Sequence, residues 1–238
     1  MIPTRTLSRA LPPETLAGFS GLRAIGDAHG AYDAFEAALA AAERDGRFVI
    51  QLGDLVDRGP YSPLCVERML EVEAAGRGLF VPGNHEMALA RLVRDGSGGA
   101  VTRQATLMQF EEHGGGLLDR FVARIQDGPV WIESAGHLFV HAAFHPAMLG
   151  ANPPDGIDLA SIAVHGYGTS AERRTGQLAR TWVDAIPAGR TVVVGHAVTA
   201  SRVVETVTGR RGGRAVFTDT GYWLDPAMPA GTYDIPFA

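Results

Sequence analysis

The sequence contains a single cysteine, Cys65, among its 238 residues. A lone cysteine excludes an internal disulfide, a cysteine-ligated zinc cluster and an iron–sulfur centre. No stretch approaches the ~18–20 consecutive apolar residues that a membrane-spanning helix requires. The N-terminal residues also lack the long apolar run of a secretion signal, because Arg5, Arg9 and Pro12 interrupt them. These absences lead us to expect a soluble, cytoplasmic protein.

A large excess of either charge is missing as well. The chain has 21 basic and 26 acidic residues, a net charge of −5, which argues against a broad nucleic-acid-binding surface. Apolar residues make up 46% and charged residues 20%, a composition that argues against a disordered chain. The length suits one large domain. We therefore divide the chain into an N-terminal arm (1–20) and a domain (21–238) with a helical insert at about 95–129.

Short apolar runs alternate with helical patterns in the first half of the chain. Strands are predicted at 22–25, 48–52 and 78–81, and helices at 32–44, 63–75 and 86–94. Strand, loop and helix in succession, three times over, predict βαβ units, a mainly parallel sheet and an α/β fold class. Further strands are predicted at 130–132, 138–141, 191–194, 202–207 and 215–218, the last two forming a hairpin around residues 209–213.

Polar residues gather where these strands are predicted to end. Three blocks directly follow the first three strands: Gly26-Asp27-Ala28-His29-Gly30, Gly53-Asp54-Leu55-Val56-Asp57-Arg58-Gly59 and Gly83-Asn84-His85-Glu86. His141 and His196 stand at the ends of two later strands. Ligands of open α/β sheets bind beyond the carboxyl ends of the strands, so we expect the functional site there.

The residue types in these blocks indicate a metal centre. Asp27 and His29 are separated by one residue, so both can turn toward one ion, and Asp54 can bridge two ions through its two oxygens. The remaining candidate ligands are Asn84, His141 and His196. Oxygen and imidazole ligands without thiolate suit Mn, Fe or Zn, with Mn as our first choice. Two such ions ~3.5–4 Å apart lower the pKa of a bridging water.

Three residues beside the ligands are candidates for catalysis. His85 adjoins Asn84 and can face a leaving group while Asn84 faces the metal. Asp57 can fix the tautomer of His85 and raise its pKa, which makes the two a general-acid dyad. Arg58 can hold phosphoryl oxygens through its planar fork of donors.

These blocks resemble the signature motifs of the phosphoprotein phosphatase branch of the calcineurin-like metallophosphoesterases. The resemblance covers residues 22–221 and implies two packed mixed β-sheets flanked by helices. It implies one ion at Asp27, His29 and Asp54. A second ion would take Asp54, Asn84, His141 and His196. His85 would be the proton donor, Asp57 its partner and Arg58 a phosphate contact.

The later segments are similar to the phosphatase module of bacterial polynucleotide kinase-phosphatases, and by that likeness Asp219 also lines the site. We therefore expect a phosphoesterase in which metal-bound hydroxide attacks a phosphate monoester, with a serine/threonine protein phosphatase ranked first. A diadenosine tetraphosphate hydrolase and an RNA-end phosphatase or 2′,3′-cyclic phosphodiesterase are the alternatives. The expected partner is accordingly a phosphoprotein, a nucleotide or an RNA end, and not a membrane. A catalytically inactive metal-binding adaptor is the alternative outside the enzymes.

Overall fold

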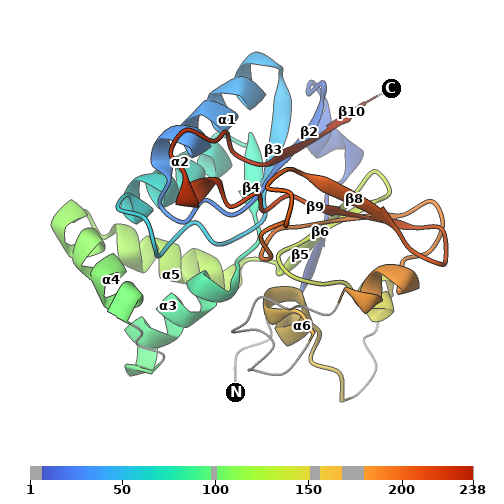
Figure 1. The fold of residues 1–238 in the computed structure, drawn as a ribbon. Helices are drawn as coiled ribbons and strands as arrows, with labels where there is room; N and C mark the ends of the chain where they lie inside the picture. Colours follow the sequence, from blue (N-terminus) through green and yellow to red (C-terminus); the bar gives the residue numbers. More distant parts are fainter. Residues whose placement is uncertain (1–6, 98–100, 151–155, 168–179, 238) are drawn as a thin grey trace.

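The computed structural model describes residues 7–97, 101–150, 156–167 and 180–237. Within them, two mixed β-sheets pack face to face (Figure 1). One sheet contains, in spatial order, β10 (Thr232–Pro236), β2 (Gly21–Ile25), β3 (Arg47–Gln51) and β4 (Gly78–Phe80). The other contains β1 (Ser8–Ala10), β5 (Trp131–Ser134), β6 (His137–Val140), β7 (Thr191–Val194), β9 (Arg214–Phe217) and β8 (Glu205–Thr208).

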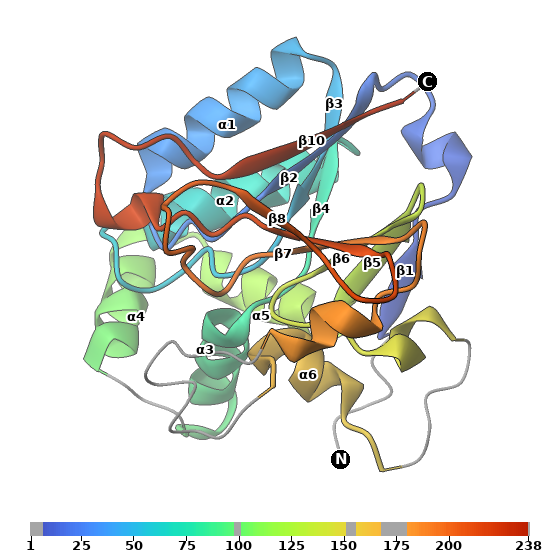
Figure 2. The ribbon, with the colours of Figure 1, turned by 45° about the vertical axis from the view of Figure 1, so that its right-hand side comes forward.

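Helices cover the outer face of each sheet (Figure 2). The described α-helices are α1 (Tyr32–Arg44), α2 (Ser62–Ala74), α3 (Asn84–Asp95), α4 (Val101–His113), α5 (Leu117–Asp127) and α6 (Leu159–His165). Short 3-10 helices are η1 (Pro13–Leu16), η2 (Pro146–Leu149), η3 (Thr181–Ala185) and η4 (Tyr222–Leu224). Helices α1 and α2 pack on the four-stranded sheet, whereas α6 packs on the six-stranded one. The layers therefore follow the order helix, sheet, sheet, helix.

The central core lies between the two sheets. Leu22, Phe48 and Ile50 of the four-stranded sheet belong to one buried cluster with Phe139 and Val193 of the six-stranded sheet. All five side chains are at most 2% exposed. Burial of this apolar surface joins the sheets and fixes how their strand ends lie relative to each other.

The strand directions place the ends of both sheets at one edge. Strands β2, β3 and β4 run parallel in one sheet. Strands β6, β7 and β9 run parallel in the other. The loops that follow these six strands carry the polar blocks, so the sheet topology brings together residues from position 27 to position 219.

Residues 7–20, the described part of the N-terminal arm expected at 1–20, pack against the domain. Ser8–Ala10 form an edge strand in parallel pairing with β5. Leu11 and Leu16 are buried in the core between the sheets, which attaches the described part of the arm to the domain.

Two further elements were not predicted from the sequence. Strand β10 pairs antiparallel with β2, and its Asp234 accepts two hydrogen bonds of 2.7 Å from Arg23. Helix α6 lies between two predicted strands, 138–141 and 191–194, in a region for which no helix is predicted from the sequence. The segment expected to be a helical insert, 95–129, contains α4 and α5. None of the described helices combines the length and apolarity needed to cross a bilayer.

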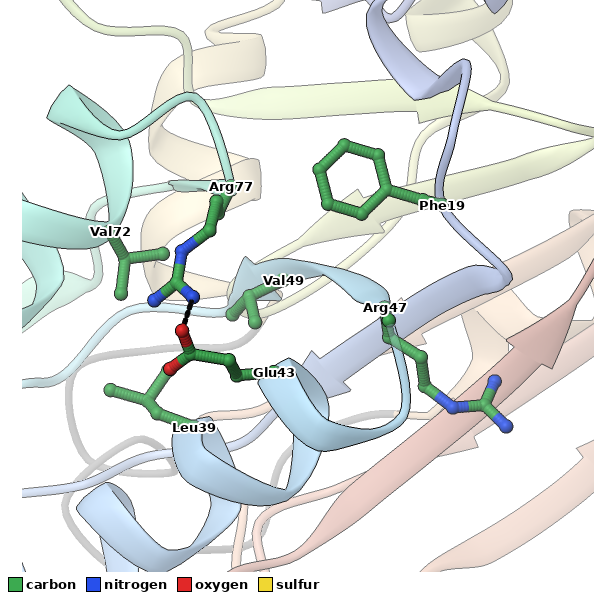
Figure 3. Close-up of a pocket in the computed structure, with 8 residues that line it drawn as sticks. Phe19, Leu39, Glu43, Arg47, Val49, Val72 and Arg77 are labelled. Atoms are coloured by element: carbon green, nitrogen blue, oxygen red, sulfur yellow. Dashed lines mark ion pairs between the residues drawn. The ribbon is translucent and has the colours of Figure 1, made fainter.

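A small pocket of about 50 Å³ lies at the opposite end of the strands from the polar blocks. Phe19, Leu39 and Val72 contribute apolar walls, and an ion pair between Arg77 and Glu43 crosses one side (Figure 3). The pocket contains none of the candidate site residues.

Candidate metal centre and active site

The structure brings the six predicted metal ligands together. Asp27 and His29 follow β2, Asp54 follows β3, Asn84 begins α3, His141 follows β6 and His196 follows β7. Of these, Asp27, His29, Asp54 and His141 are at most 2% exposed. Two groups of atoms have the spacing of a cation site: His29, Asp54 and His85, and Asp54, His141 and His196. Asp54 belongs to both groups, which is the position of a bridging ligand.

The group around His141 consists of nitrogen and oxygen atoms that can present lone pairs. Nδ1 of His141 lies 2.6 Å from the carbonyl oxygen of Leu52, so Nδ1 carries the proton and Nε2 presents a lone pair. That Nε2 lies 3.1 Å from Oδ1 of Asn84, 3.0 Å from Nδ1 of His196 and 3.5 Å from Oδ2 of Asp54. Lone pairs gathered in this way favour a cation between them.

The group around His29 has the same character. Nδ1 of His29 lies 2.8 Å from the carbonyl oxygen of Val56, which again leaves Nε2 with a lone pair. This Nε2 is 3.5 Å from Oδ2 of Asp54 and 3.9 Å from Oδ2 of Asp27. Oδ2 of Asp27 is buried and has no hydrogen-bond donor among the described residues. An unpaired buried carboxylate oxygen is costly, and a cation would satisfy it.

Electrostatics agree with a cation-binding site. Burial, followed by the charges of Asp219 and Asp54, raises the pKa of Asp27 well above its usual range. Burial also raises the pKa of Asp219 to about 6. Three carboxyl groups in one buried site repel each other unless a positive charge is present. Oxygen and imidazole donors, together with these clustered carboxyl groups, fit divalent metal ions of the Mn, Fe or Zn type.

The histidines are held in the form that ligates metals. Burial lowers the pKa of His29 and of His196 to about 3 and also lowers the pKa of His141. Burial alone would raise the pKa of Asp54, but His141 and the other surrounding histidines lower it overall. Neutral imidazoles therefore face an ionised carboxylate near neutral pH.

His85 occupies a different position from the six predicted ligands. Its Nδ1 lies 2.7 Å from Oδ2 of Asp57, whereas its Nε2 is 3.9 Å from Oδ2 of Asp54 and 3.5 Å from Nη2 of Arg58. Burial lowers the pKa of His85, but the charges of Asp54 and Asp57 outweigh it and raise the pKa overall. At 12% side-chain exposure, His85 lies at the rim of a largely buried centre.

Backbone strain concentrates at this centre. Seven non-glycine residues have positive φ among the described residues, and five of them are His29, Asp54, Asp57, Arg58 and His196. The left-handed region costs non-glycine residues free energy and persists where surrounding contacts impose it. The contacts around these loops therefore impose backbone conformations that non-glycine residues rarely adopt.

Glu86 is a positioning residue that sequence reasoning did not single out. Its fully buried carboxylate accepts hydrogen bonds from the backbone N–H groups of Asp54, Leu55 and Gly83, at 2.7, 2.8 and 2.8 Å. Glu86 thereby ties the loop after β3 to the start of α3. The sequence does carry a signal for this role. Glu86 is the third residue of the helix, where a glutamate side chain commonly accepts a hydrogen bond from the backbone N–H of the residue before the helix.

Three residues outside the predicted set also approach the site. Thr106 and Arg103 of α4 contact Asp57, and Trp223 of η4 lies beneath Arg58. Neither α4 nor η4 carries a recognisable motif, so only the tertiary structure associates these residues with the site. Asp219, expected to line the centre, is 1% exposed and accepts a hydrogen bond from the N–H of Gly221.

Comparison with known proteins agrees with this architecture. The family model of the calcineurin-like phosphoesterases matches residues 22–200, and the chain belongs to this family. It is thus an enzyme of the metallophosphoesterase class, whose members depend on metal. No curated protein matches the sequence.

Three solved structures share the fold. A "putative diadenosine tetraphosphatase" is 19% identical, with a TM-score of 0.63 over 98% of this chain and 99% of the other. A variant of a cold-active protein tyrosine phosphatase is 15% identical, with a TM-score of 0.57 over 98% and 78%. A protein serine/threonine phosphatase from Saccharomyces cerevisiae is 13% identical, with a TM-score of 0.52 over 90% and 71%.

Proposed function

We propose that this chain is a phosphomonoesterase of the phosphoprotein phosphatase branch, with a binuclear metal centre at Asp27, His29, Asp54, Asn84, His141 and His196. The observation that carries the proposal is the position of Asp54 between two groups of potential ligands. Two divalent ions, when bound, would supply Lewis-acid charge and an activated water. We assign Mn as the preferred ion because oxygen ligands and imidazoles are mixed without thiolate.

The protein's own residues would position the substrate and move a proton. Arg58, on the exposed side of His85, would hold phosphoryl oxygens through charge-assisted hydrogen bonds. Asp57 orients His85 through Nδ1, so that Nε2 is the nitrogen directed toward the leaving oxygen. An adaptor without catalysis would have no use for this dyad of His85 and a buried Asp57.

His85 rather than Asp27 belongs to one of the two atom groups with cation spacing. We nevertheless assign Asp27 as the ligand, since its buried Oδ2 has no other described partner. His85 already has a partner in Asp57 and lies nearer to solvent.

We propose a phosphoserine or phosphothreonine protein as the first candidate substrate. A dinucleoside polyphosphate is the second, because the fold neighbour that bears that name matches this chain over almost the whole length of both. RNA-end processing is the third candidate.

The test is phosphate release by the metal-free protein reloaded with Mn²⁺. The panel contains p-nitrophenyl phosphate, its bis-ester, a phosphopeptide, diadenosine tetraphosphate and an RNA with a cyclic phosphate end. Metal-dependent release with the phosphopeptide as the best substrate supports the first assignment. Preference for diadenosine tetraphosphate or for the cyclic RNA end would replace the phosphoprotein assignment with the corresponding substrate. Absence of turnover on every substrate, with metal bound, would favour the adaptor.

A further inference from the structure

We propose, on the basis of the proposed function, that helix α4 is a positioning element for the proton-donating dyad. Thr106 and Gln109 of α4 would fix the turn that carries Asp57 and Arg58. This assignment gives the helical segment after α3 a role in catalysis, although none of its residues is placed among the metal ligands.

The turn that carries the dyad is strained. Asp57 and Arg58 have φ values of 69° and 70°, so two successive non-glycine residues occupy the left-handed region. Isolated residues in that region are already unfavourable, and a pair of them relaxes unless external contacts hold it. The N–H of Gly59 donates to the carbonyl oxygens of His29 and Asp57, which secures one side of the turn.

Helix α4 supplies the other side. Oγ1 of Thr106 lies 2.6 Å from Oδ1 of Asp57. Nε2 of Gln109 donates to the carbonyl oxygen of Gly59, and its Oε1 accepts from the N–H of Ser62, both at 3.1 Å. Residues three apart share one face of a helix, so a single face of α4 forms hydrogen bonds at both ends of the segment from Asp57 to Ser62.

Both oxygens of the Asp57 carboxylate therefore have polar partners. Oδ1 accepts from Thr106, while Oδ2 faces Nδ1 of His85 at 2.7 Å and Nε of Arg103 at 3.3 Å. Asp57 is fully buried, so water cannot replace a missing donor. Removing the Thr106 hydroxyl would leave Oδ1 unpaired and allow the carboxylate to rotate away from His85. The hydroxyl therefore acts on catalysis through Asp57.

The first experiment removes the hydroxyl and keeps the shape. Thr106→Val should lower kcat about tenfold or more for a phosphate ester with a poor leaving group. This loss is a part of the roughly 10²- to 10⁴-fold rate enhancement that a general acid contributes. KM should change less than kcat. Hydrolysis of p-nitrophenyl phosphate, whose leaving group needs less protonation, should fall less. Thr106→Ser retains the hydroxyl and should restore the wild-type ratio between the two substrates.

A double-mutant cycle separates this role from a general packing defect. In an Asp57→Asn background, Thr106→Val should cause little further loss on the poor substrate, because the two residues act as one unit. Equal losses for both substrates, or additive losses in the cycle, would overturn the positioning role of Thr106.

The second experiment requires no activity. In the metal-free protein, Gln109→Leu should accelerate hydrogen exchange of the Ser62 amide about tenfold, the effect of losing one hydrogen bond. Gln104→Leu makes the same chemical change at an exposed site on α4 and should leave that amide unchanged. An unchanged exchange rate of the Ser62 amide in Gln109→Leu would overturn the role of Gln109 in fixing this turn. Inactivity of the wild-type protein would instead overturn the proposed function and leave the exchange result interpretable.

Discussion

The guanidinium carbon of Arg58 lies 4.2 Å from the centroid of the Trp223 ring. The same ring packs edge-on against the imidazole of His29, with the centroids 5.0 Å apart. Trp223 thus links the proposed phosphate contact to a proposed metal ligand. Stacking on an indole face restricts the guanidinium without occupying its hydrogen-bond donors, which stay available for phosphoryl oxygens.

This contact predicts a measurable effect on anion affinity. Trp223→Leu should weaken inhibition by inorganic phosphate about two- to fivefold, the equivalent of an exposed cation–π contact of about 0.5–1 kcal/mol. Trp223→Phe keeps an aromatic face and should remain near wild type. In an Arg58→Ala background, Trp223→Leu should have no further effect. An unchanged inhibition constant in Trp223→Leu alone would refute this account of Arg58.

The shared position of Asp54 predicts how metal content responds to substitution. Asp27→Asn should reduce the bound Mn from two equivalents to about one, because its Oδ2 faces only the His29 group. Asp54→Asn should weaken both sites, since the carboxylate belongs to both groups. Elemental analysis after gel filtration gives the stoichiometry. Two tightly bound ions in Asp54→Asn would exclude a bridging role.

Metal removal should destabilise the folded protein. A ligand that binds only the native state contributes about 2.7 kcal/mol when present at 100 times its dissociation constant. We expect a chelator to lower the melting temperature accordingly. In Asp27→Asn the metal-free form should melt at or above the wild-type metal-free form, because the amide removes the free-energy cost of burying or protonating this carboxyl group beside Asp219 and Asp54. A lower melting temperature for metal-free Asp27→Asn would show that the carboxylate is needed for packing instead.

The candidate metal ligands were more predictable from the sequence than the residues that hold the surrounding loops in place. Asp27, Asp54 and Asn84 stand directly after apolar runs, and a parallel sheet brings such positions to one edge. The contacts of Thr106 and Trp223 depend on how α4 and η4 pack against the loops. That packing joins residues 49 positions apart in the case of Thr106 and Asp57, and no local pattern encodes it.

The fold was predicted in the same uneven way. The helix expected at 32–44 has those bounds in the structure, because its apolar residues recur at helical spacing and Asp45-Gly46 ends it. Strand β1 has three exposed residues and therefore no alternation that could reveal it. Strand β10 ends in a proline, and its pairing with β2 crosses almost the whole length of the chain.

Glu86 provides a test of how the centre is supported. Glu86→Gln should lower the free energy of unfolding by about 1–3 kcal/mol, because one carboxylate oxygen becomes an N–H₂ group facing backbone donors. Urea titration of the metal-free protein measures the change. Glu112→Gln, on the exposed face of α4, is the matched control and should be neutral. Equal stability of the two variants would mean that the loop after β3 does not depend on Glu86.

His85 separates metal binding from proton transfer. His85→Ala should retain both metal ions, because its Nδ1 is engaged by Asp57 and it lies outside the proposed ligand set. Its kcat should fall by about 10²–10⁴ for an alkyl phosphate, which needs a general acid, and much less for p-nitrophenyl phosphate. Metal analysis and parallel kinetics on the two substrates measure both effects. Loss of one metal ion in His85→Ala would instead identify His85 as a ligand, in line with its place beside His29 and Asp54. Equal rates for wild type and variant on the alkyl phosphate would remove it from the reaction.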